Sequence, residues 1–419
     1  MKTPLRIGIV GLGGFAGSHH NTVARLEERG HVRLICTCDP AAANFAAAQQ
    51  AWRFPARGVG VFADYRAMLE ACHANLDLVV IPTPIGLHAE MHDAVTARGL
   101  PAYVEKPPTL DYAELERMIV ADRRAPKSSL VGFNFIIEQP RLALKQRLLA
   151  GEFGAVRGAT LSGLWPRPAS YFSRNDWAGH LFKDGRAVVD SCFGNAFAHF
   201  VHNMLFWLGG PELLSWAQIA AVRAELYRAH AIEGADTFFV EADTPAGVTI
   251  RFALTHACAG ESTHAETVEC EQASLHYAVG RQVEVRWRDG RIERSAPAAF
   301  DGLAENHLEY YRYLRGEAPR PATTLVDCRP FVALNDLAHI SSGRITPIPA
   351  GFVTRLRDDK DQKDYVSVAG IAAAMEQFLT RGLWPGAHGW NRERGSTAAP
   401  ADLPRLYAVL RDMAGLPSA

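Results

Sequence analysis

Residues 6–20 read RIGIVGLGGFAGSHH, an apolar run followed at once by a glycine-rich turn and the start of a helical pattern. Each small residue has a mechanical reason in a dinucleotide-binding turn. Gly11 permits the tight bend, Gly13 lets the backbone approach a pyrophosphate, and Ala16 lets helix and strand pack closely. The N-terminus of such a helix attracts phosphates. The stretch therefore predicts the first strand, turn and helix of a Rossmann domain.

The next expected strand, Val32–Cys38, is followed directly by Asp39. An acid at this point accepts a hydrogen bond from the adenine ribose 2′-hydroxyl of a dinucleotide. Pro-Ala-Ala follows Asp39, so no arginine is at hand for the 2′-phosphate of NADP. The pattern favours NAD over NADP. The bland alternative is a structural turn with a helix-capping aspartate.

Composition and charge indicate an ordinary globular protein. The 419 residues are enough for two domains, and 48% of them are hydrophobic and 21% charged. With a net charge of −1, the chain has no excess of positive charge that would attract nucleic acid or a membrane surface. The N-terminus lacks the apolar region of a signal peptide, and seven scattered cysteines argue against a disulfide framework. We therefore expect a cytoplasmic protein, and no residue cluster has the spacing of a metal site.

Strand-like and helix-like segments alternate through the first third of the chain, which predicts a parallel sheet covered by helices. Near residue 135 the pattern changes to period-two alternation, as in Val248–Leu254. We expect an N-terminal α/β Rossmann domain with a doubly wound parallel sheet, then an α+β domain with a large, mostly antiparallel open sheet. The expected ranges are 1–134 for NAD binding, 135–350 for substrate binding and oligomerisation, and 351–419 for a C-terminal extension packed on the body. A free sheet face favours a homodimer or homotetramer.

Two further stretches, IPTPIGLH (81–88) and YVEKPPTL (103–110), end the expected fourth and fifth strands. Ligands bind at the carboxyl ends of parallel strands, so Thr83, Pro84, His88, Glu105 and Lys106 should face the cofactor. Taken alone, Glu105 and Lys106 could equally be a surface ion pair.

The order of GIVGLGGFAGSHH, CDP, TPIGLH, EKP and GFN (residues 132–134) resembles the glucose–fructose oxidoreductase and inositol dehydrogenase family, Gfo/Idh/MocA. The resemblance implies that Lys106 reaches the substrate hydroxyl, where an ammonium stabilises a developing alkoxide. It also implies a cis Lys106–Pro107 bond. The cofactor site implied by motifs and resemblance comprises Gly11, Gly13, Gly14, Phe15, Ala16, Asp39, Thr83, Pro84, His88, Glu105, Lys106 and Asn134.

The second catalytic element of this family is Asp-x-x-x-His, and here the chain has Asn195-Ala-Phe-Ala-His199. We expect a helix over 195–208, in which four-residue spacing places both side chains on one face. His199 suits the general base. Asn195 can bind a sugar hydroxyl but cannot hold an imidazolium by charge. Asp190 is a possible substitute, although its spacing places it on a different face.

The block RPASYFSRNDWAGH (167–180) combines aromatic rings with amide and guanidinium donors, which suits carbohydrates. Tyr171, Arg174, Asn175 and Trp177 are therefore expected to bind substrate together with Asn195. The alternative is a loop whose rings only fill the domain junction.

These features predict an NAD-dependent oxidoreductase that acts on a secondary alcohol of a sugar or polyol-like substrate, with catalytic Lys106 and His199. Two alternatives stay open. A glycoside hydrolase or lyase that uses NAD for transient ring oxidation would share the same motifs, and so would a non-catalytic NAD-bound regulator. Net NADH production separates the dehydrogenase from the hydrolase.

Overall fold

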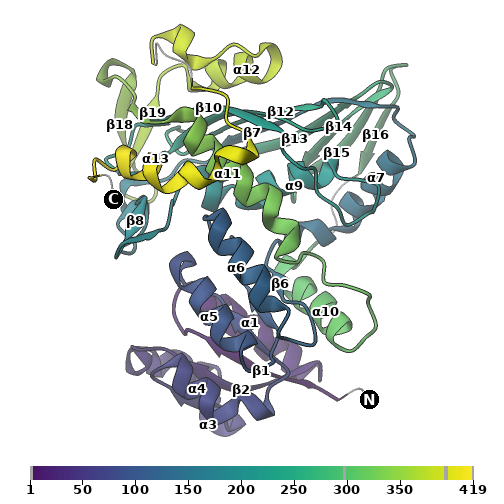
Figure 1. Cartoon of the computed structure of the whole chain (residues 1–419), viewed down its shortest axis with the longest axis vertical. Coiled ribbons are helices and arrows are strands. Elements are labelled where there is room, and N and C mark those ends of the chain that lie inside the picture. The colour runs from purple at the N-terminus through teal and green to yellow at the C-terminus, as the bar shows by residue number, and fades with distance from the viewer. Residues whose placement is uncertain (1–2, 296–298, 391–394, 418–419) are drawn as a thin grey trace. The chain divides into compact units, whose positions relative to one another are not determined.

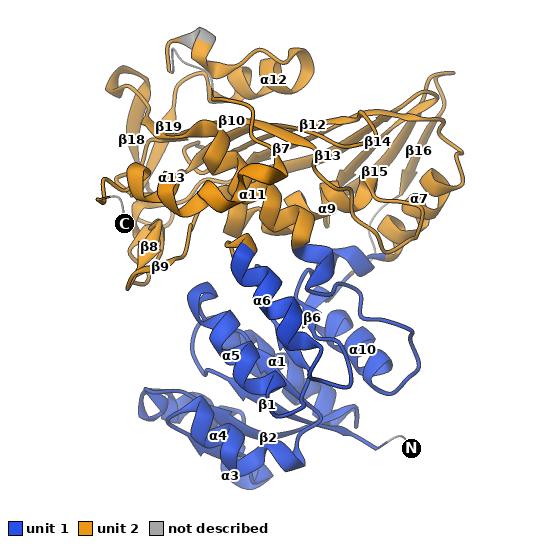
Figure 2. Cartoon of the chain, viewed as in Figure 1, with its two compact units in different colours: residues 1–109, 113–138, 300–328 blue, residues 110–112, 139–299, 329–419 orange. Residues whose placement is uncertain are grey.

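The computed structural model describes residues 3–295, 299–390 and 395–417. The chain forms two compact units, which Figure 2 distinguishes by colour. The first comprises residues 1–109, 113–138 and 300–328, and the second comprises residues 110–112, 139–299 and 329–419. Both units are thus assembled from separate stretches of chain, whereas the ranges expected from the sequence are continuous.

The first unit is built on a six-stranded parallel sheet in the order β3-β2-β1-β4-β5-β6, which confirms the expected Rossmann architecture. The central strands β1 and β4 are almost continuously buried, as strands covered on both faces must be. The strands are β1 Leu5–Val10, β2 Val32–Cys38, β3 Gly60–Phe62, β4 Leu78–Ile81, β5 Ala102–Val104 and β6 Leu130–Val131. The associated helices are α1 Phe15–Glu28, α2 Ala46–Ala51, α3 Phe54–Arg57, α4 Tyr65–Cys72, α5 His88–Thr96, α6 Tyr112–Asp122 and α10 Gly302–Leu314.

Helix α10 comes from the late segment 300–328 and packs within the first unit. The Tyr310 hydroxyl donates to the carbonyl oxygens of Ala102 (3.1 Å) and Ser128 (3.0 Å). The helix begins at Gly302, where the Asp301 side chain accepts a hydrogen bond from Ala304 N and so caps it. This return of the chain places α10 residues beside those of helix α1.

The second unit is built on a nine-stranded sheet in the order β16-β15-β14-β13-β7-β12-β11-β10-β17. All neighbours are antiparallel except the pairs β7–β12 and β10–β17, which confirms the expected mostly antiparallel sheet. Its strands are β7 Val156–Leu164, β10 Ala221–Arg228, β11 Thr237–Asp243, β12 Thr249–Thr255, β13 Thr263–Cys270, β14 Ala273–Ala278, β15 Gln282–Trp287, β16 Ile292–Ser295 and β17 Ile345–Pro347. The helices are α7 Gln139–Leu149, α8 Ala169–Phe172, α9 Ala198–Leu208, α11 Arg329–Ser342, α12 Ile371–Arg381 and α13 Leu406–Met413.

The middle of this sheet is covered on both faces (Figure 1). Successive side chains of a strand point to opposite faces. On β11, Phe238 stacks on Phe193 with ring centres 5.2 Å apart, while Phe239 contacts Phe378 of α12 at 5.4 Å. The face expected to be free is therefore covered by α12 over this strand.

Two short hairpins complete the second unit. Strands β8 Phe182–Lys183 and β9 Arg186–Ala187 form one, and β18 Val353–Asp358 and β19 Lys363–Val368 form the other. The charge run RDDKDQKD (357–364) lies at the tip of the second hairpin, where all its residues are exposed. Among the residues that the structure describes, no helix has the length and apolar character needed to cross a membrane.

Candidate active site

The glycine-rich turn has the geometry that phosphate binding requires. Gly11 and Gly14 have φ of 99° and 55°, in the left-handed region that favours glycine. A Cβ on Gly11 would lie 3.4 Å from the Cβ of Ala16, an ordinary contact, so the backbone conformation and not the space is what requires glycine at position 11. Helix α1 begins at Phe15 and has no side-chain cap. This helix end therefore suits an anionic group.

Asp39 follows β2 as expected and fixes the glycine-rich turn. Its Oδ2 accepts a hydrogen bond from Leu12 N (3.0 Å), and its Oδ1 accepts one from Ala41 N (2.9 Å). A carboxylate oxygen has more than one lone pair, so Asp39 can also accept a ribose hydroxyl. A Cβ on Gly13 would lie 2.8 Å from the ring of Phe45. This contact is a second reason for glycine at position 13, and it is not readable from the sequence.

His88 joins the loops that follow β4 and β5. Its Nε2 lies 2.8 Å from the Thr83 carbonyl oxygen, and its Nδ1 lies 3.0 Å from the carbonyl oxygen of Pro107. The side chain is fully buried, and burial lowers its pKa. His88 thus fastens the backbone around Thr83 to the backbone after Lys106, while Pro84 is exposed. The Lys106–Pro107 bond is cis, as the resemblance implied.

Glu105 ends a buried chain of hydrogen bonds that the sequence did not reveal. His19 Nε2 lies 3.2 Å from Glu105 Oε1, and His19 Nδ1 lies 3.0 Å from His307 Nε2. His307 Nδ1 in turn lies 3.1 Å from the Tyr311 hydroxyl. The three side chains that lead to Glu105 are all fully buried.

One arrangement of protons satisfies all these hydrogen bonds when Glu105 is ionised. The carboxylate can only accept, so His19 donates from Nε2, and the Nδ1 of a neutral His19 ring then accepts from His307 Nε2–H. His307 Nδ1 then accepts from the Tyr311 hydroxyl. Burial lowers the pKa of His307 well below its usual value, which keeps that ring neutral as this arrangement needs. Every proton in the series therefore points toward Glu105, whose Oε2 also accepts from Lys106 N (3.0 Å).

The G-F-N segment completes this part of the site. A Cβ on Gly132 would lie 2.7 Å from Glu105 Oε1, so glycine leaves room for the carboxylate. Among the described residues, Asn134 Oδ1 is buried and has no hydrogen-bond partner. A buried acceptor without a donor fits a bound polar group. The turn, Asp39 and Asn134 therefore fit a dinucleotide cofactor, with the adenine ribose at Asp39 and the phosphates at the start of α1.

In the second unit, Asn195 and His199 do not share one regular helix, so the expected helix over 195–208 is wrong at its start. Cys192–Ala196 forms a π-helical turn, in which Phe197 N donates to the carbonyl oxygen of Cys192 (2.8 Å). Helix α9 then begins at Ala198, with His199 half-buried in its first turn. The π-helical turn breaks the four-residue geometry on which the one-face prediction rests, and such turns recur at functional sites.

Asp190 and Asn195 are hydrogen-bonded in spite of their unfavourable spacing. Asn195 Nδ2 donates to Asp190 Oδ1 at 2.7 Å, and Gly179 N donates to Asp190 Oδ2 at 2.7 Å. The preceding residue, Val189, has φ of 45°, which is strained for a β-branched side chain. Asn195 replaces the aspartate that the resemblance implies, and Asp190 thus supplies a carboxylate directly beside it.

The aromatic block folds onto itself. The Arg174 guanidinium lies over the Tyr171 ring, 3.7 Å from its centre, and 5.4 Å from the centre of the Trp177 ring. Asn175 Oδ1 accepts hydrogen bonds from Trp177 N and Ala178 N, so this amide shapes the loop. Arg167, which the sequence had not singled out, lies over the same Tyr171 ring at 4.4 Å. Its place in the sequence, between Trp165 and Tyr171, was the feature from which it could have been predicted.

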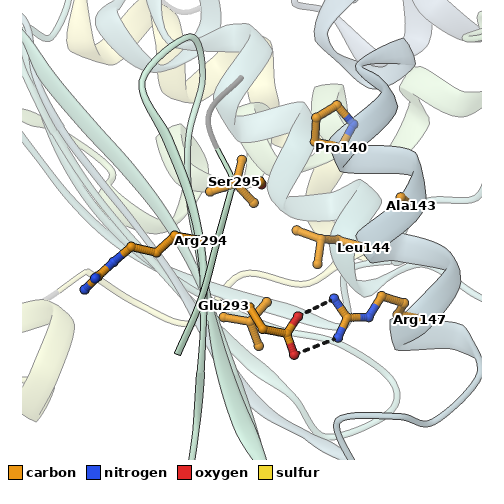
Figure 3. Close-up of a pocket in the computed structure, with 9 residues that line it drawn as sticks. Pro140, Ala143, Leu144, Arg147, Glu293, Arg294 and Ser295 are labelled. Atoms are coloured by element: carbon orange, nitrogen blue, oxygen red, sulfur yellow. Dashed lines mark hydrogen bonds and ion pairs between the residues drawn. The ribbon is translucent and has the colours of Figure 1, made fainter. Parts of the chain in front are cut away.

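A cavity of about 220 Å³ lies elsewhere in the second unit, between α7 and β15–β16 (Figure 3). Pro140, Leu144 and Val283 line it, and Arg147 binds Glu293 across it at 2.9 Å. None of the expected site residues is among those that line it. This cavity is therefore separate from the candidate active site.

Comparison with known proteins places these motifs in a family. Residues 5–133 match the model of the GFO_IDH_MocA oxidoreductase family, which has an NAD-binding Rossmann fold. Inositol 2-dehydrogenase of Rhizobium meliloti is 27% identical over 184 residues, or 43% of this chain and 51% of that protein. Inositol 2-dehydrogenase 4 of Saccharopolyspora erythraea is 32% identical over 152 residues, or 36% and 42% of the two chains. The chain spans about half the length of the curated relatives it matches.

Solved structures share the fold. The WlbA dehydrogenase of Bordetella pertussis, in complex with NADH and UDP-GlcNAcA, superposes with a TM-score of 0.66 at 23% identity. The match covers 81% of this chain and 96% of that one. A levoglucosan dehydrogenase in complex with NADH and L-sorbose gives a TM-score of 0.68 at 17% identity over 81% and 97% of the chains. From the first strand into the G-F-N segment, residues 5–133 of this chain thus match the NAD-binding Rossmann domain of the Gfo/Idh/MocA oxidoreductases.

Proposed function

We propose that the protein is an NAD-dependent oxidoreductase that transfers a hydride between nicotinamide and a secondary alcohol of a sugar- or polyol-like substrate. The observation that carries the proposal is the buried carboxylate of Glu105, held by His19 and by the amide of Lys106. This arrangement fixes the backbone of Lys106 after β5, at the carboxyl edge of the Rossmann sheet where ligands bind. The inositol dehydrogenases among the curated relatives support a polyol-like substrate.

We propose NAD as the cofactor because of Asp39. Its carboxylate would repel the 2′-phosphate of NADP but accepts the 2′-hydroxyl of NAD. NAD supplies the acceptor for the hydride when it is bound. Gly11, Gly13, Gly14, Phe15, Ala16, Asp39, Thr83, Pro84 and Asn134 would hold it, and His88 would position the two loops on which Thr83 and Lys106 lie.

Lys106 and His199 would divide the acid–base work. The ammonium of Lys106 stabilises negative charge on the substrate oxygen, and the imidazole of His199 takes up or returns the hydroxyl proton. Asn195 binds a substrate hydroxyl, and Tyr171, Arg174, Asn175 and Trp177 belong to the same substrate site. We also propose a homodimer or homotetramer as the working form.

The test is nicotinamide absorbance while sugars, polyols and aryl glycosides are screened against the purified full chain. We expect NADH formation with a sugar or polyol, and a loss of kcat of at least about a hundredfold in Lys106→Met. Lys360→Met, in the exposed β18–β19 turn, is the matched control and should keep full activity. Aglycone release without net NADH would instead identify the hydrolase, and the absence of both bound cofactor and turnover would overturn the proposal.

A further inference from the structure

Two arginines of the second unit share one aromatic ring. The guanidinium carbons of Arg167 and Arg174 lie 4.4 Å and 3.7 Å from the centre of the Tyr171 ring. Arg167 also lies 4.1 Å from the centre of the Trp165 ring. Arg174 Nη1 donates to the Tyr171 carbonyl oxygen at 2.5 Å. Contacts with three rings and a carbonyl thus hold the two cations close together.

Neither cation has an acidic partner in the described part of the chain, where no carboxylate lies within ion-pair distance of Arg167 or Arg174. The Nε atom of Arg167 is buried and lacks any hydrogen-bond partner among the same residues. Burial lowers the pKa of Arg167, and the nearby charge of Arg174 lowers it further. A partly buried guanidinium beside a second positive charge is unfavourable, and an anion bound to both would relieve this cost.

Several other arginines of this unit are paired with carboxylates. Arg141 is fully buried and forms a two-point ion pair with Glu266, at 2.6 Å and 3.2 Å. Arg147 lies between Glu152 and Glu293. Arg223 and Arg251 share the carboxylate of Glu241. Arg167 and Arg174 differ from these arginines, because they lie close together on one ring and no carboxylate of the described residues pairs with either.

The backbone of Arg167 is fixed to the sheet. Its carbonyl oxygen accepts a hydrogen bond from His230 Nε2 (3.1 Å), and its amide donates to the His256 carbonyl oxygen (3.3 Å). His230 Nδ1 lies 2.7 Å from the fully buried Asp236 carboxylate, whose other oxygen accepts from Thr237. A donor held this firmly loses little freedom when a ligand binds.

We infer that Arg167 and Arg174 form a preformed site for an anionic group of the substrate, a carboxylate or a phosphate. The inference rests on the proposed function and deepens it, because it assigns the substrate to the acidic sugars or sugar phosphates. Both groups present paired oxygens that match the fork of a guanidinium. The rings of Trp165, Tyr171 and Trp177 can stack on the apolar face of the attached sugar.

The experiment is calorimetric titration of the full chain, saturated with NAD, with glucose, glucuronate, glucose 6-phosphate and inorganic phosphate. We expect at least one of the two anionic sugars to bind about tenfold more tightly than glucose, with an affinity that falls as salt rises. Glucuronate and glucose 6-phosphate separate a carboxylate from a phosphate as the source of the charge. Inorganic phosphate shows whether the anion suffices without the sugar.

Arg174→Met and Arg167→Met should lose the preference for the anionic sugar, measured as the ratio of its affinity to that of glucose in the same variant. Arg357→Met, at an exposed position of the β18–β19 hairpin, should retain the preference. Because Arg167 is partly buried, its variant is compared only after a thermal melt shows that it folds, and the exposed Arg174 supplies the second test.

Equal affinity for all four compounds, or no binding of any, would overturn the inference. NADH formation from neutral sugars with no anion preference would also overturn it and leave the proposed oxidoreductase standing. Tight anion binding that depends on Arg167 and Arg174, without turnover of any sugar, would support the anion site and count against the proposed reaction.

Discussion

His19 Nε2 lies 3.2 Å from Glu105 Oε1, so the helix that follows the glycine-rich turn holds the carboxylate next to Lys106. The same helix begins at the turn that would receive the cofactor phosphates. Helix α1, which follows the cofactor turn, is therefore joined to the E-K-P segment by buried hydrogen bonds inside the first unit. The contact between His19 and His307 joins α10 to the same network.

Removal of the His19 ring should destabilise the protein more than removal of an ordinary histidine. His19→Ala leaves the buried Glu105 carboxylate with one donor fewer, and an unsatisfied buried group costs about 1–3 kcal/mol. Urea unfolding measures this loss. His73→Ala is the control, since the His73 ring binds a carbonyl of its own helix, α4, and is only half-buried. Equal losses for both variants would show that the Glu105 contact adds nothing.

Gly132→Ala should displace the Glu105 carboxylate. The added Cβ would lie 2.7 Å from Oε1, which is closer than real contacts allow. We expect a loss of about 1–3 kcal/mol in unfolding free energy and weaker NAD binding, measured by denaturation and by cofactor titration. Gly351→Ala is the matched control, because a Cβ there has no heavy atom within 4 Å. A Gly132→Ala protein that behaves like the control would contradict the packing described around Glu105.

Restoring the family aspartate at position 195 should harm this protein. In Asn195→Asp a second carboxylate would lie where Asn195 Nδ2 now donates to Asp190 Oδ1 at 2.7 Å. Two carboxylates this close cannot both be ionised at low cost, so kcat should fall and its pH profile should shift.

The exchange variant Asp190→Asn/Asn195→Asp restores one amide and one carboxylate. It should recover much of the activity lost in the single variant, as a double-mutant cycle of steady-state kinetics would show. If Asn195→Asp instead raises kcat at neutral pH, Asp190 does not stand in for an aspartate at position 195 in supporting His199 as the base.

Acidification should begin to destabilise the fold at pH values above those at which carboxylates titrate. Burial lowers the pKa of His20 and His339 to about 4 and that of His256 to about 3. The unfolded chain binds protons at these sites near pH 6.5, whereas the folded chain does not, so stability falls as the pH drops from about 6.5 toward 4.

His20→Gln isolates one contribution to this dependence. Glutamine keeps a donor for the Gly11 carbonyl oxygen, which His20 Nε2 now contacts at 3.0 Å, but it does not titrate. Urea midpoints between pH 7.5 and pH 4.5 should therefore form a flatter profile in this variant. Parallel profiles for the variant and the natural sequence would mean that His20 has the same pKa in the folded and the unfolded chain.

The Rossmann unit was predictable because its signals are local. Each strand is a short apolar run, and the turn after β1 needs glycine for reasons of backbone geometry alone. The bounds of Val32–Cys38 were predicted to the residue. The short β3 escaped prediction because three residues carry too little periodicity.

The rest of the site depends on contacts between distant segments. The π-helical turn at Cys192–Ala196 accompanies the bond between Asn195 and Asp190, which no helical spacing suggests. His307 meets His19 only because α10 returns to the first unit, and the pairing of Arg167 with Arg174 requires the fold of the 167–180 loop. Local pattern identified the residue types at these places but not their partners.

The cover over β11 belongs to the same chain as the sheet. Phe378 of α12 shields Phe239 by an intramolecular contact, so that contact does not weaken when the protein is diluted. A sheet face shielded by a second copy would lose its cover as the concentration fell below the dissociation constant. For this part of the sheet, the C-terminal extension has made the burial of apolar surface independent of protein concentration.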